Sequence, residues 1–108
     1  MSSKHSYHRG LSKVNEGSDL QNANKFKMTK NWDAAGHAFT EIAALDYRSG
    51  NRRDAATNYV EAGNCYKKTD PNEAVNSLLK ATEIHTDMGK FNKVAKHHQS
   101  IADIYANE

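Results

Sequence analysis

The sequence predicts an all-α protein, a tetratricopeptide-like solenoid of helical hairpins that forms a segment of a right-handed superhelix. Three observations lead to this fold class. From Asn31 onward, apolar residues recur at steps of three and four, the spacing of one helix face. Turn and capping residues divide this stretch into helices of similar length. A shift of 20 residues superimposes four small or apolar positions, Ala35, Ala55, Val75 and Ala95.

Length and composition fit one small domain. The chain has 108 residues, of which 37% are hydrophobic and 26% charged, enough for one core and too few for two. The mean hydropathy is −0.90, and no apolar run approaches the roughly 18 residues of a membrane span. Cys65 is the only cysteine, so no internal disulfide forms and a reducing compartment is expected. We therefore expect a cytoplasmic protein.

The chain is expected to divide into a polar tail at 1–18 and a helical-repeat domain at 19–108. The tail is rich in Ser, Lys, His and Gly and has no apolar period, which is typical of a disordered segment. It holds His5 and His8, but two histidines without a thiolate or carboxylate cluster do not make a metal site. Ser18 and Gln21 have the spacing of a capping box, so a short helix is expected at 19–28.

The next two helices are expected at 31–48 and 52–68. Asn31 and Asn51 stand at their starts as N-cap residues, and Gly50 supplies the left-handed backbone that ends the first of them. The residues expected to face inward from the first are Trp32, Ala35, Phe39, Ile42, Ala43 and either Asp46 or Tyr47. Those expected from the second are Ala55, Ala56, Tyr59, Ala62, Cys65 and Tyr66.

The last two helices are expected at 71–88 and 91–106. Asp70, Pro71 and Glu73 give the clearest start signal, an N-cap, a proline at the first helical position and an acid at the third. Gly89 ends the first of these two helices. Its inward residues are expected to be Ala74, Val75, Leu78, Leu79, Ala81, Thr82 and Ile84. Those of the last helix are expected to be Phe91, Val94, Ala95, His98, Ile101, Ala102 and Tyr105.

Motifs that carry chemistry are missing from the sequence. It has no glycine-rich phosphate loop, no Cys-x-x-Cys, no His-Glu-x-x-His and no Gly-x-Ser-x-Gly. Cys65 falls on an inward face and is expected to be a small buried hydrophobe. His97 and His98 are adjacent, so they point about 100° apart on a helix and do not share one ion. His98 is expected to pack inward and His97 to be on the surface. We expect no enzyme, no metal and no cofactor.

Basic residues at helix ends and turns are the informative feature that remains. They are Lys30, Lys67, Lys68, Lys90 and Lys96. Alternate turns of a solenoid lie along the same edge, so these lysines are expected to form a row along one side. Such a row suits an acidic, elongated partner. Each exposed contact adds only about 0.2–1 kcal/mol, so binding is expected to be distributed and sensitive to salt.

Several stretches in order resemble one known family. These are Phe26 to Phe39 (FKMTKNWDAAGHAF), Asp54 to Pro71 with its EAGNCYKKTDP end, and Thr86 to Phe91 (TDMGKF) followed by AKHH and IADIY. They look like the soluble NSF attachment proteins of the alpha/beta (Sec17-like) type, over about residues 20–108. Gly36 and Ala62 beside Trp32, Phe39 and Tyr59 also fit the close helix packing of tetratricopeptide-like pairs.

The resemblance implies a non-catalytic adaptor. Members of this family bind assembled, syntaxin-containing SNARE bundles and recruit the ATPase NSF, which dismantles them in vesicle-mediated protein transport, including ER–Golgi transport, and in membrane fusion. It implies a cytoplasmic protein, peripheral to membranes. It also implies that the acidic SNARE surface is met by the lysines named above, Lys30, Lys67, Lys68, Lys90 and Lys96.

Two departures from the family pattern shape the expectations. The family begins with further helices and an apolar loop that enters membranes, where this chain has its polar tail, and it continues for many helices beyond residue 108. We therefore expect a short or truncated N-terminal portion. Two other functions stay open: a stand-alone tetratricopeptide-like scaffold that grips a peptide, and binding of anionic lipid by the tail through Lys4, Arg9 and Lys13.

Overall fold

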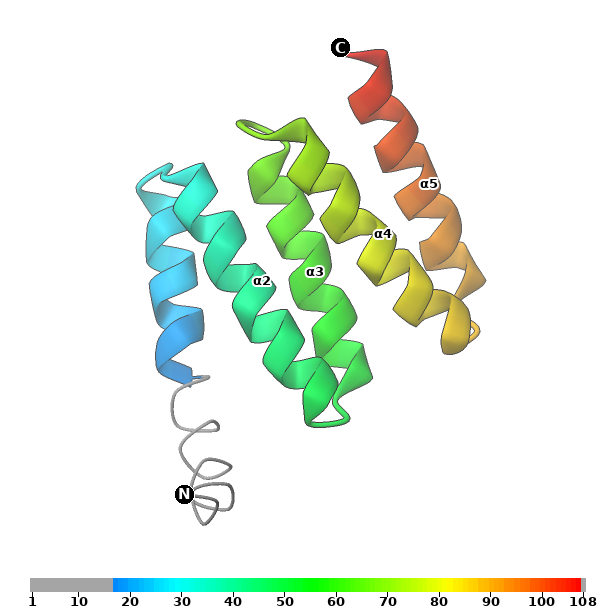
Figure 1. The fold of residues 1–108 in the computed structure, drawn as a ribbon, viewed down its shortest axis with the longest axis horizontal. Helices are drawn as coiled ribbons and strands as arrows, with labels where there is room; N and C mark the ends of the chain where they lie inside the picture. The colour runs from blue at the N-terminus through cyan, green and yellow to red at the C-terminus, as the bar shows by residue number, and fades with distance from the viewer. Residues whose placement is uncertain (1–16, 108) are drawn as a thin grey trace.

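A row of antiparallel helices, each packed against the next, makes up the structure (Figure 1). The computed structural model describes residues 17–107, and no strand occurs in that range. The helices run at 17–28 and then as α2 (Trp32–Arg48), α3 (Arg52–Tyr66), α4 (Pro71–Asp87) and α5 (Phe91–Ala106). Within this range no helix is both long and apolar enough to cross a membrane. The predicted all-α solenoid of hairpins is confirmed.

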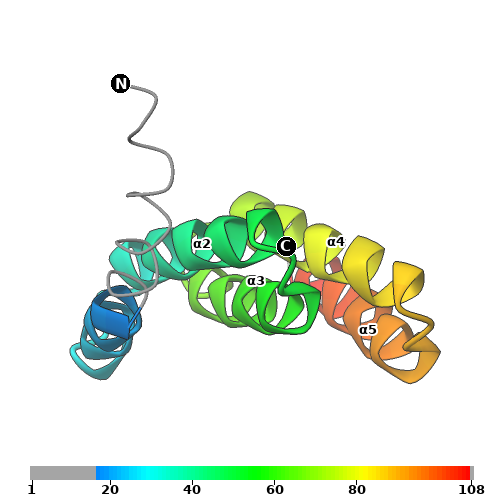
Figure 2. The ribbon, with the colours of Figure 1, turned by 90° about the horizontal axis from the view of Figure 1, so that it is seen from below.

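The helices alternate between two layers, and the row is curved. Figure 2 shows α2 and α4 in one layer, with the helix at 17–28, α3 and α5 in the other. The second layer lies on the concave side of the curve. Because antiparallel neighbours differ in layer, α3 and α5 approach one another across α4. This arrangement places side chains from α3 and α5 on one concave surface.

The observed helix bounds lie within two residues of the predicted ones. The first helix already includes residues 17 and 18, so Ser18 lies inside the helix and the predicted N-cap there is wrong. The rest of the predicted tail lies outside the described residues. The tail residues named above also lie outside the described range: His5, His8, Lys4, Arg9 and Lys13.

Local capping explains where the helices begin and end. The Asn51 Oδ1 accepts a hydrogen bond from the Asp54 N–H at 3.5 Å, and the Asp70 Oδ1 accepts one from the Glu73 N–H at 3.2 Å. Asn31 holds the N-cap position of α2, but its side chain makes no capping bond. Gly50 and Gly89 have φ of +84° and +72°, the left-handed conformation predicted at both helix ends.

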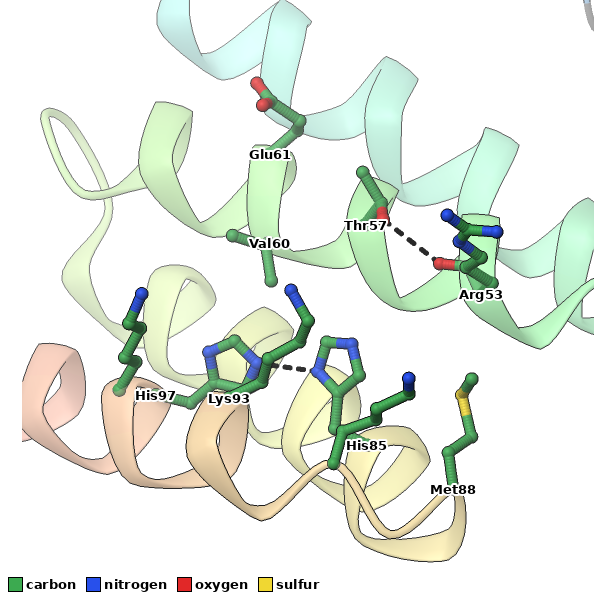
Figure 3. A pocket seen from close by; sticks show the side chains of 10 residues that line it. Arg53, Thr57, Val60, Glu61, His85, Met88, Lys93 and His97 are labelled. Atoms are coloured by element: carbon green, nitrogen blue, oxygen red, sulfur yellow. Dashed lines mark hydrogen bonds between the residues drawn. The ribbon is translucent and has the colours of Figure 1, made fainter.

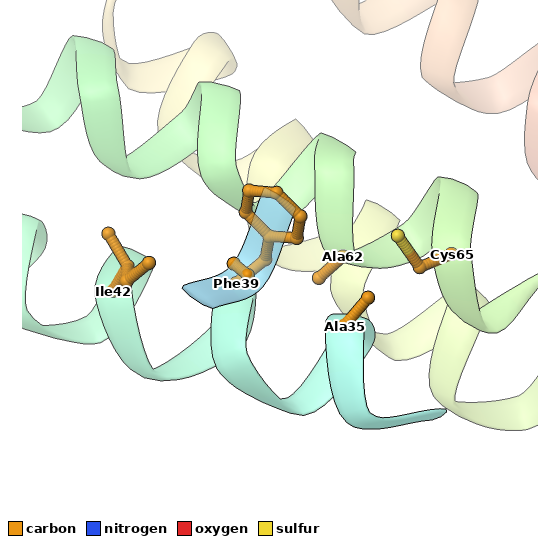
Figure 4. Close-up of a cluster of buried hydrophobic side chains, with 6 residues drawn as sticks. Ala35, Phe39, Ile42, Ala62 and Cys65 are labelled. Atoms are coloured by element: carbon orange, nitrogen blue, oxygen red, sulfur yellow. The ribbon is translucent and has the colours of Figure 1, made fainter. Parts of the chain in front are cut away.

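Small residues let α2 and α3 pack closely. Ala35, Phe39 and Ile42 of α2 face Ala62 and Cys65 of α3 (Figure 4). The two alanines are fully buried and Phe39 is 2% exposed. The small residues let the two backbones approach closely, and the Phe39 ring fills the space beside them. This dense packing is typical of tetratricopeptide-like helix pairs. The expected inward positions are therefore confirmed for this pair of helices.

The structure decides one inward position that the sequence left open and corrects two others. Asp46, and not Tyr47, faces inward from α2, since Asp46 is 4% exposed and Tyr47 is 45% exposed. The Asp46 Oδ2 accepts a hydrogen bond from Asn58 Nδ2 at 2.8 Å, which satisfies the buried carboxylate. Leu79 is 49% exposed and Ala95 is exposed, so neither faces inward as predicted, and the 20-residue period does not hold at Ala95.

The packing face of α5 corrects the histidine assignment. His97 and Ile104 are buried, while His98 is exposed, so the prediction for this histidine pair is wrong in both members. The reason is that, within residues 17–107, α5 packs mainly on α4 and buries only one narrow stripe. Phe91 and Tyr105 of the predicted stripe are 66% and 57% exposed. The apolar residues of α5 form two stripes, which their spacing in the sequence does not separate. Within the described range, only one of the two stripes packs against another helix.

Candidate functional site

A basic pocket opens between α3 and α5, with α4 behind it (Figure 3). Its volume is about 650 Å³. α3 contributes Arg53, Thr57, Val60 and Glu61, and α4 contributes His85. Met88 and Lys90 line the pocket from the turn between α4 and α5, and α5 contributes Lys93, Lys96 and His97. We call this set the α3–α5 pocket.

Cations outnumber acids in the α3–α5 pocket. Arg53, Lys90, Lys93 and Lys96 line it, and Glu61 is the only carboxylate among residues 17–107 that does so. The Glu61 Oε1 lies 2.9 Å from the Lys27 Nζ of the first helix. Because Lys27 already neutralises this carboxylate, the four cations of the pocket have no acidic partner in its lining. The pocket therefore carries a positive potential.

The start of α5 adds to this potential. Lys90 is its N-cap residue, makes no side-chain capping bond, and no acid occupies the first turn. α2, α3 and α4 each carry an acid there, Asp33, Asp54 and Glu73. The partial positive charge of the α5 N-terminus is thus reinforced by lysines.

Two buried imidazoles form the back of the pocket. The His85 Nδ1 and the His97 Nε2 are 2.8 Å apart and share a hydrogen bond, and the rings stack with centroids 5.0 Å apart. Burial lowers the pKa of His85, and Lys93 and Lys90 lower it further. Burial also lowers the pKa of His97, with His85, Lys93 and His98 adding to the effect. Both rings are therefore held neutral at pH 7.

The five lysines predicted from the sequence fall into two groups. All are exposed, but only Lys90 and Lys96 line the pocket. Lys30, Lys67 and Lys68 lie in the turns at 29–31 and 67–70, at the upper ends of the helices in Figure 1, whereas the turn at 88–90 lies at the lower end. Every second turn shares an edge, which separates Lys90 from the other turn lysines. The expected single row along one edge is therefore wrong for Lys90.

The Lys68 side chain also has a structural role at the upper edge. Its Nζ lies 5.0 Å from the centroid of the Trp32 ring of α2, within the range of a cation–π contact. The Thr69 Oγ1 in the same turn donates a hydrogen bond to the Asp33 Oδ1. These contacts tie the turn at 67–70 to the start of α2, which fixes where Lys67 and Lys68 are presented.

Sequence reasoning missed Arg53 and Lys93. Lys93 could have been found, because Lys90, Lys93 and Lys96 follow one another at steps of three and so share one side of a helix. Arg53 gives no such signal. It joins these lysines only because the curvature of the row brings α3 and α5 together. The site can bind negative charge through ion pairs and charge-assisted hydrogen bonds.

Residues 17–107 give little support for metal binding or for a nucleophilic cysteine. That range contains no group of three or more His, Cys, Asp or Glu side chains placed to hold a metal ion. Cys65 is buried, as predicted, and burial raises the pKa of its thiol. A buried, protonated thiol is a poor nucleophile.

Comparison with known proteins identifies the family of this chain, and the matched residues include the whole α3–α5 pocket. The family model of the soluble NSF attachment protein (SNAP) matches residues 5–108. The chain belongs to the SNAP family. The match starts at residue 5, so the resemblance extends further toward the N-terminus than the expected start near residue 20.

Curated SNAP-family relatives are longer than this chain. The chain is 52% identical over 101 residues to the alpha-soluble NSF attachment protein of Homo sapiens, covering 92% of this chain and 34% of that protein. It is 48% identical over 110 residues to the beta-soluble NSF attachment protein of Bos taurus, covering 96% and 37%. It is 35% identical over 101 residues to a probable vesicular-fusion protein sec17 homolog of Schizosaccharomyces pombe, covering 92% and 35%. The chain thus spans about a third of the length of these SNAP-family proteins.

Proposed function

We propose that this chain is a non-catalytic adaptor segment that binds assembled SNARE bundles and serves, with the rest of a SNAP-type protein, to recruit the ATPase NSF for their disassembly. The observation that carries the proposal is the α3–α5 pocket on the concave surface, with its four cations. The family names support it, since the relatives are described as NSF attachment proteins and vesicular-fusion proteins. We further propose a cytoplasmic protein, peripheral to membranes, in vesicle transport and membrane fusion.

The proposed partner surface is acidic and rod-shaped. A concave cationic surface matches a rod that carries negative charge along its side, because complementary potentials orient the two before contact. Lys90 and Lys96 act from the pocket in this proposal. Lys30, Lys67 and Lys68 act from the upper edge, so the rod crosses the helices from one edge toward the other.

The energetics favour many weak contacts. Exposed ion pairs contribute about 0.2–1 kcal/mol each, so no single lysine decides affinity. Screening acts over about 8–10 Å at physiological salt. Binding is therefore expected to weaken steadily with ionic strength.

A pull-down with assembled and with unassembled SNAREs, each at two salt concentrations, tests the proposal. The chain is expected to retain the assembled bundle at low salt and to lose most of it at high salt. Charge reversal in the K67E/K68E/K90E/K96E variant is expected to abolish retention while the circular dichroism of the chain stays helical. Unchanged retention by this variant would sink the assignment.

The same experiment separates the peptide-binding scaffold from the adaptor. A scaffold that grips a short segment depends on groove side chains and on an extended peptide. It would retain unassembled SNAREs as well as assembled ones and would survive the charge reversal. Preference for the assembled bundle together with loss on charge reversal supports the adaptor.

A further inference from the structure

The histidine pair leaves two polar atoms without partners at the back of the α3–α5 pocket. Their shared hydrogen bond uses the His85 Nδ1 and the His97 Nε2. Within residues 17–107 the His85 Nε2 and the His97 Nδ1 have no hydrogen-bond partner among the protein side chains. The two residues are 6% and 7% exposed. Buried polar atoms are normally satisfied, so the His85 Nε2, which can donate, marks a place where a ligand can supply an acceptor.

The ring of His85 points into the space between α3 and α5. Figure 3 shows it extending from α4 toward α3, with Lys93 beside it. If the His97 Nε2 donates the shared proton, the His85 Nε2 carries a proton of its own and becomes a donor directed into the pocket. A ligand with strong acceptor oxygens selects this arrangement.

Positive charge surrounds these nitrogens from two helices. Arg53 contributes from α3, and Lys90, Lys93 and Lys96 contribute from α5, at an N-terminus that has no acid in its first turn. Glu61 is engaged by Lys27 at 2.9 Å. Four cations in one pocket repel one another unless an anion lies between them.

We propose that the α3–α5 pocket binds a small ligand that carries two or more phosphate groups. Its volume of about 650 Å³ lies within the range of about 300–1,000 Å³ for small-molecule sites. Phosphate oxygens accept bidentate hydrogen bonds from an arginine and single bonds from lysines. Four separate cations match several clustered phosphates better than one. The shared chemistry is a cluster of phosphate monoesters, on a soluble polyphosphate or on a lipid headgroup.

Binding is expected to be coupled to proton uptake. A phosphate in the pocket raises the pKa of the His85–His97 pair, since it places negative charge beside rings that now face cations. The charged groups around the pair are Arg53 and Glu61 on α3 and Lys90, Lys93, Lys96 and the titratable His98 on α5. The phosphate groups of the ligand also titrate near neutral pH, since their second pKa is about 6. The histidine contribution is therefore the difference in proton uptake between the wild type and a variant that lacks both imidazoles.

This site goes beyond the proposed function, although both use Lys90 and Lys96. Lys67 and Lys68 separate the two, because they belong to the proposed SNARE surface and lie outside the pocket. A variant can therefore lose phosphate binding and keep SNARE binding, or the reverse. The failure of one proposal can thus be told apart from the failure of the other.

Isothermal titration of the full chain with inositol hexakisphosphate tests the proposal. One ligand is expected to bind per chain, and R53Q/K93Q is expected to weaken binding about tenfold or more. The matched control K67Q/K68Q removes the same charge from a turn outside the pocket and is expected to stay within about twofold. Equal weakening by both variants, or no binding by the wild type, would overturn the proposal.

Two further arms identify the ligand source and the role of the histidines. Flotation with vesicles that contain 5 mol% phosphatidylinositol 4,5-bisphosphate in phosphatidylcholine tests the lipid headgroup, and R53Q/K93Q is expected to lower any flotation. Free polyphosphate binding without flotation assigns a soluble ligand. Titration in two buffers of different ionisation enthalpy gives the number of protons exchanged on binding, and the wild type is expected to take up more protons than H85N/H97Q. Equal proton exchange by the two proteins would contradict the assignment of the histidines.

Discussion

The Tyr66 ring of α3 lies directly over the backbone of Gly36 in α2. A Cβ atom at position 36 would come within 2.8 Å of three atoms of that ring, well inside van der Waals contact. Tyr66 is half-buried and also packs toward the α4 side of the core. The missing Cβ therefore lets the Tyr66 ring of α3 pack directly against the α2 backbone.

Substitution of Gly36 by alanine is expected to destabilise the fold. Alanine favours a helix by about 1 kcal/mol over glycine, but overpacking against the Tyr66 ring costs about 1–3 kcal/mol. We expect a net loss of about 1 kcal/mol, measured by urea denaturation. In a Y66L background the same substitution is expected to be neutral or stabilising, because the ring is gone. A stabilising G36A in the wild-type background would contradict the observed contact.

Stability is expected to fall as pH drops below about 7 because of the His85–His97 pair. The pKa of each ring is lowered in the folded protein from its usual value of 6.5. The unfolded chain therefore binds protons first as pH falls, which favours unfolding. The contribution is fully present above pH 6.5 and is lost as pH falls through the lowered folded values.

Denaturation of wild type and H85N/H97Q between pH 5 and pH 8 measures this effect. The amides at these positions can keep a hydrogen bond between the two side chains but do not titrate. The variant is expected to show a flatter dependence of unfolding free energy on pH above pH 5. Parallel curves for the two proteins would mean that the pair does not control the slope.

The Cys65 thiol is expected to be protected in the folded protein. The residue is 2% exposed, and burial raises the pKa of the thiol from 9.0, so both access and thiolate content are low. At pH 8 its reaction with a disulfide reagent is expected to be about 100-fold slower in the native chain than in urea. Equal rates in the two conditions would show that the α2–α3 core opens freely.

Local signals predicted most of the fold. Asp70, Pro71 and Glu73 placed the start of α4, and Gly50 and Gly89 placed two helix ends, because caps act within one helical turn. The choice between Asp46 and Tyr47 could not be made from spacing, since both fall near the inward stripe. It depends on Asn58 of the neighbouring helix, which hydrogen-bonds Asp46.

Long-range geometry explains the errors. His98 belongs to an apolar stripe of α5 as regular as the one that holds His97, and only packing on α4 decides which stripe is buried. Lys90 lies at the opposite edge from Lys30, Lys67 and Lys68 because consecutive turns of antiparallel helices alternate between the two edges of the row (Figure 1). Arg53 joins the pocket through the curvature of the whole row, which no local period contains.

In the proposed function, the cations of the α3–α5 pocket contact an assembled SNARE bundle. The most direct measurement is the equilibrium dissociation constant of the bundle by fluorescence anisotropy for wild type, K90E/K96E and a control, K25E/K80E, which reverses two exposed lysines outside the pocket. We predict that K90E/K96E weakens binding about tenfold or more, while the control stays within about twofold. Equal affinities for K90E/K96E and the control would contradict the account.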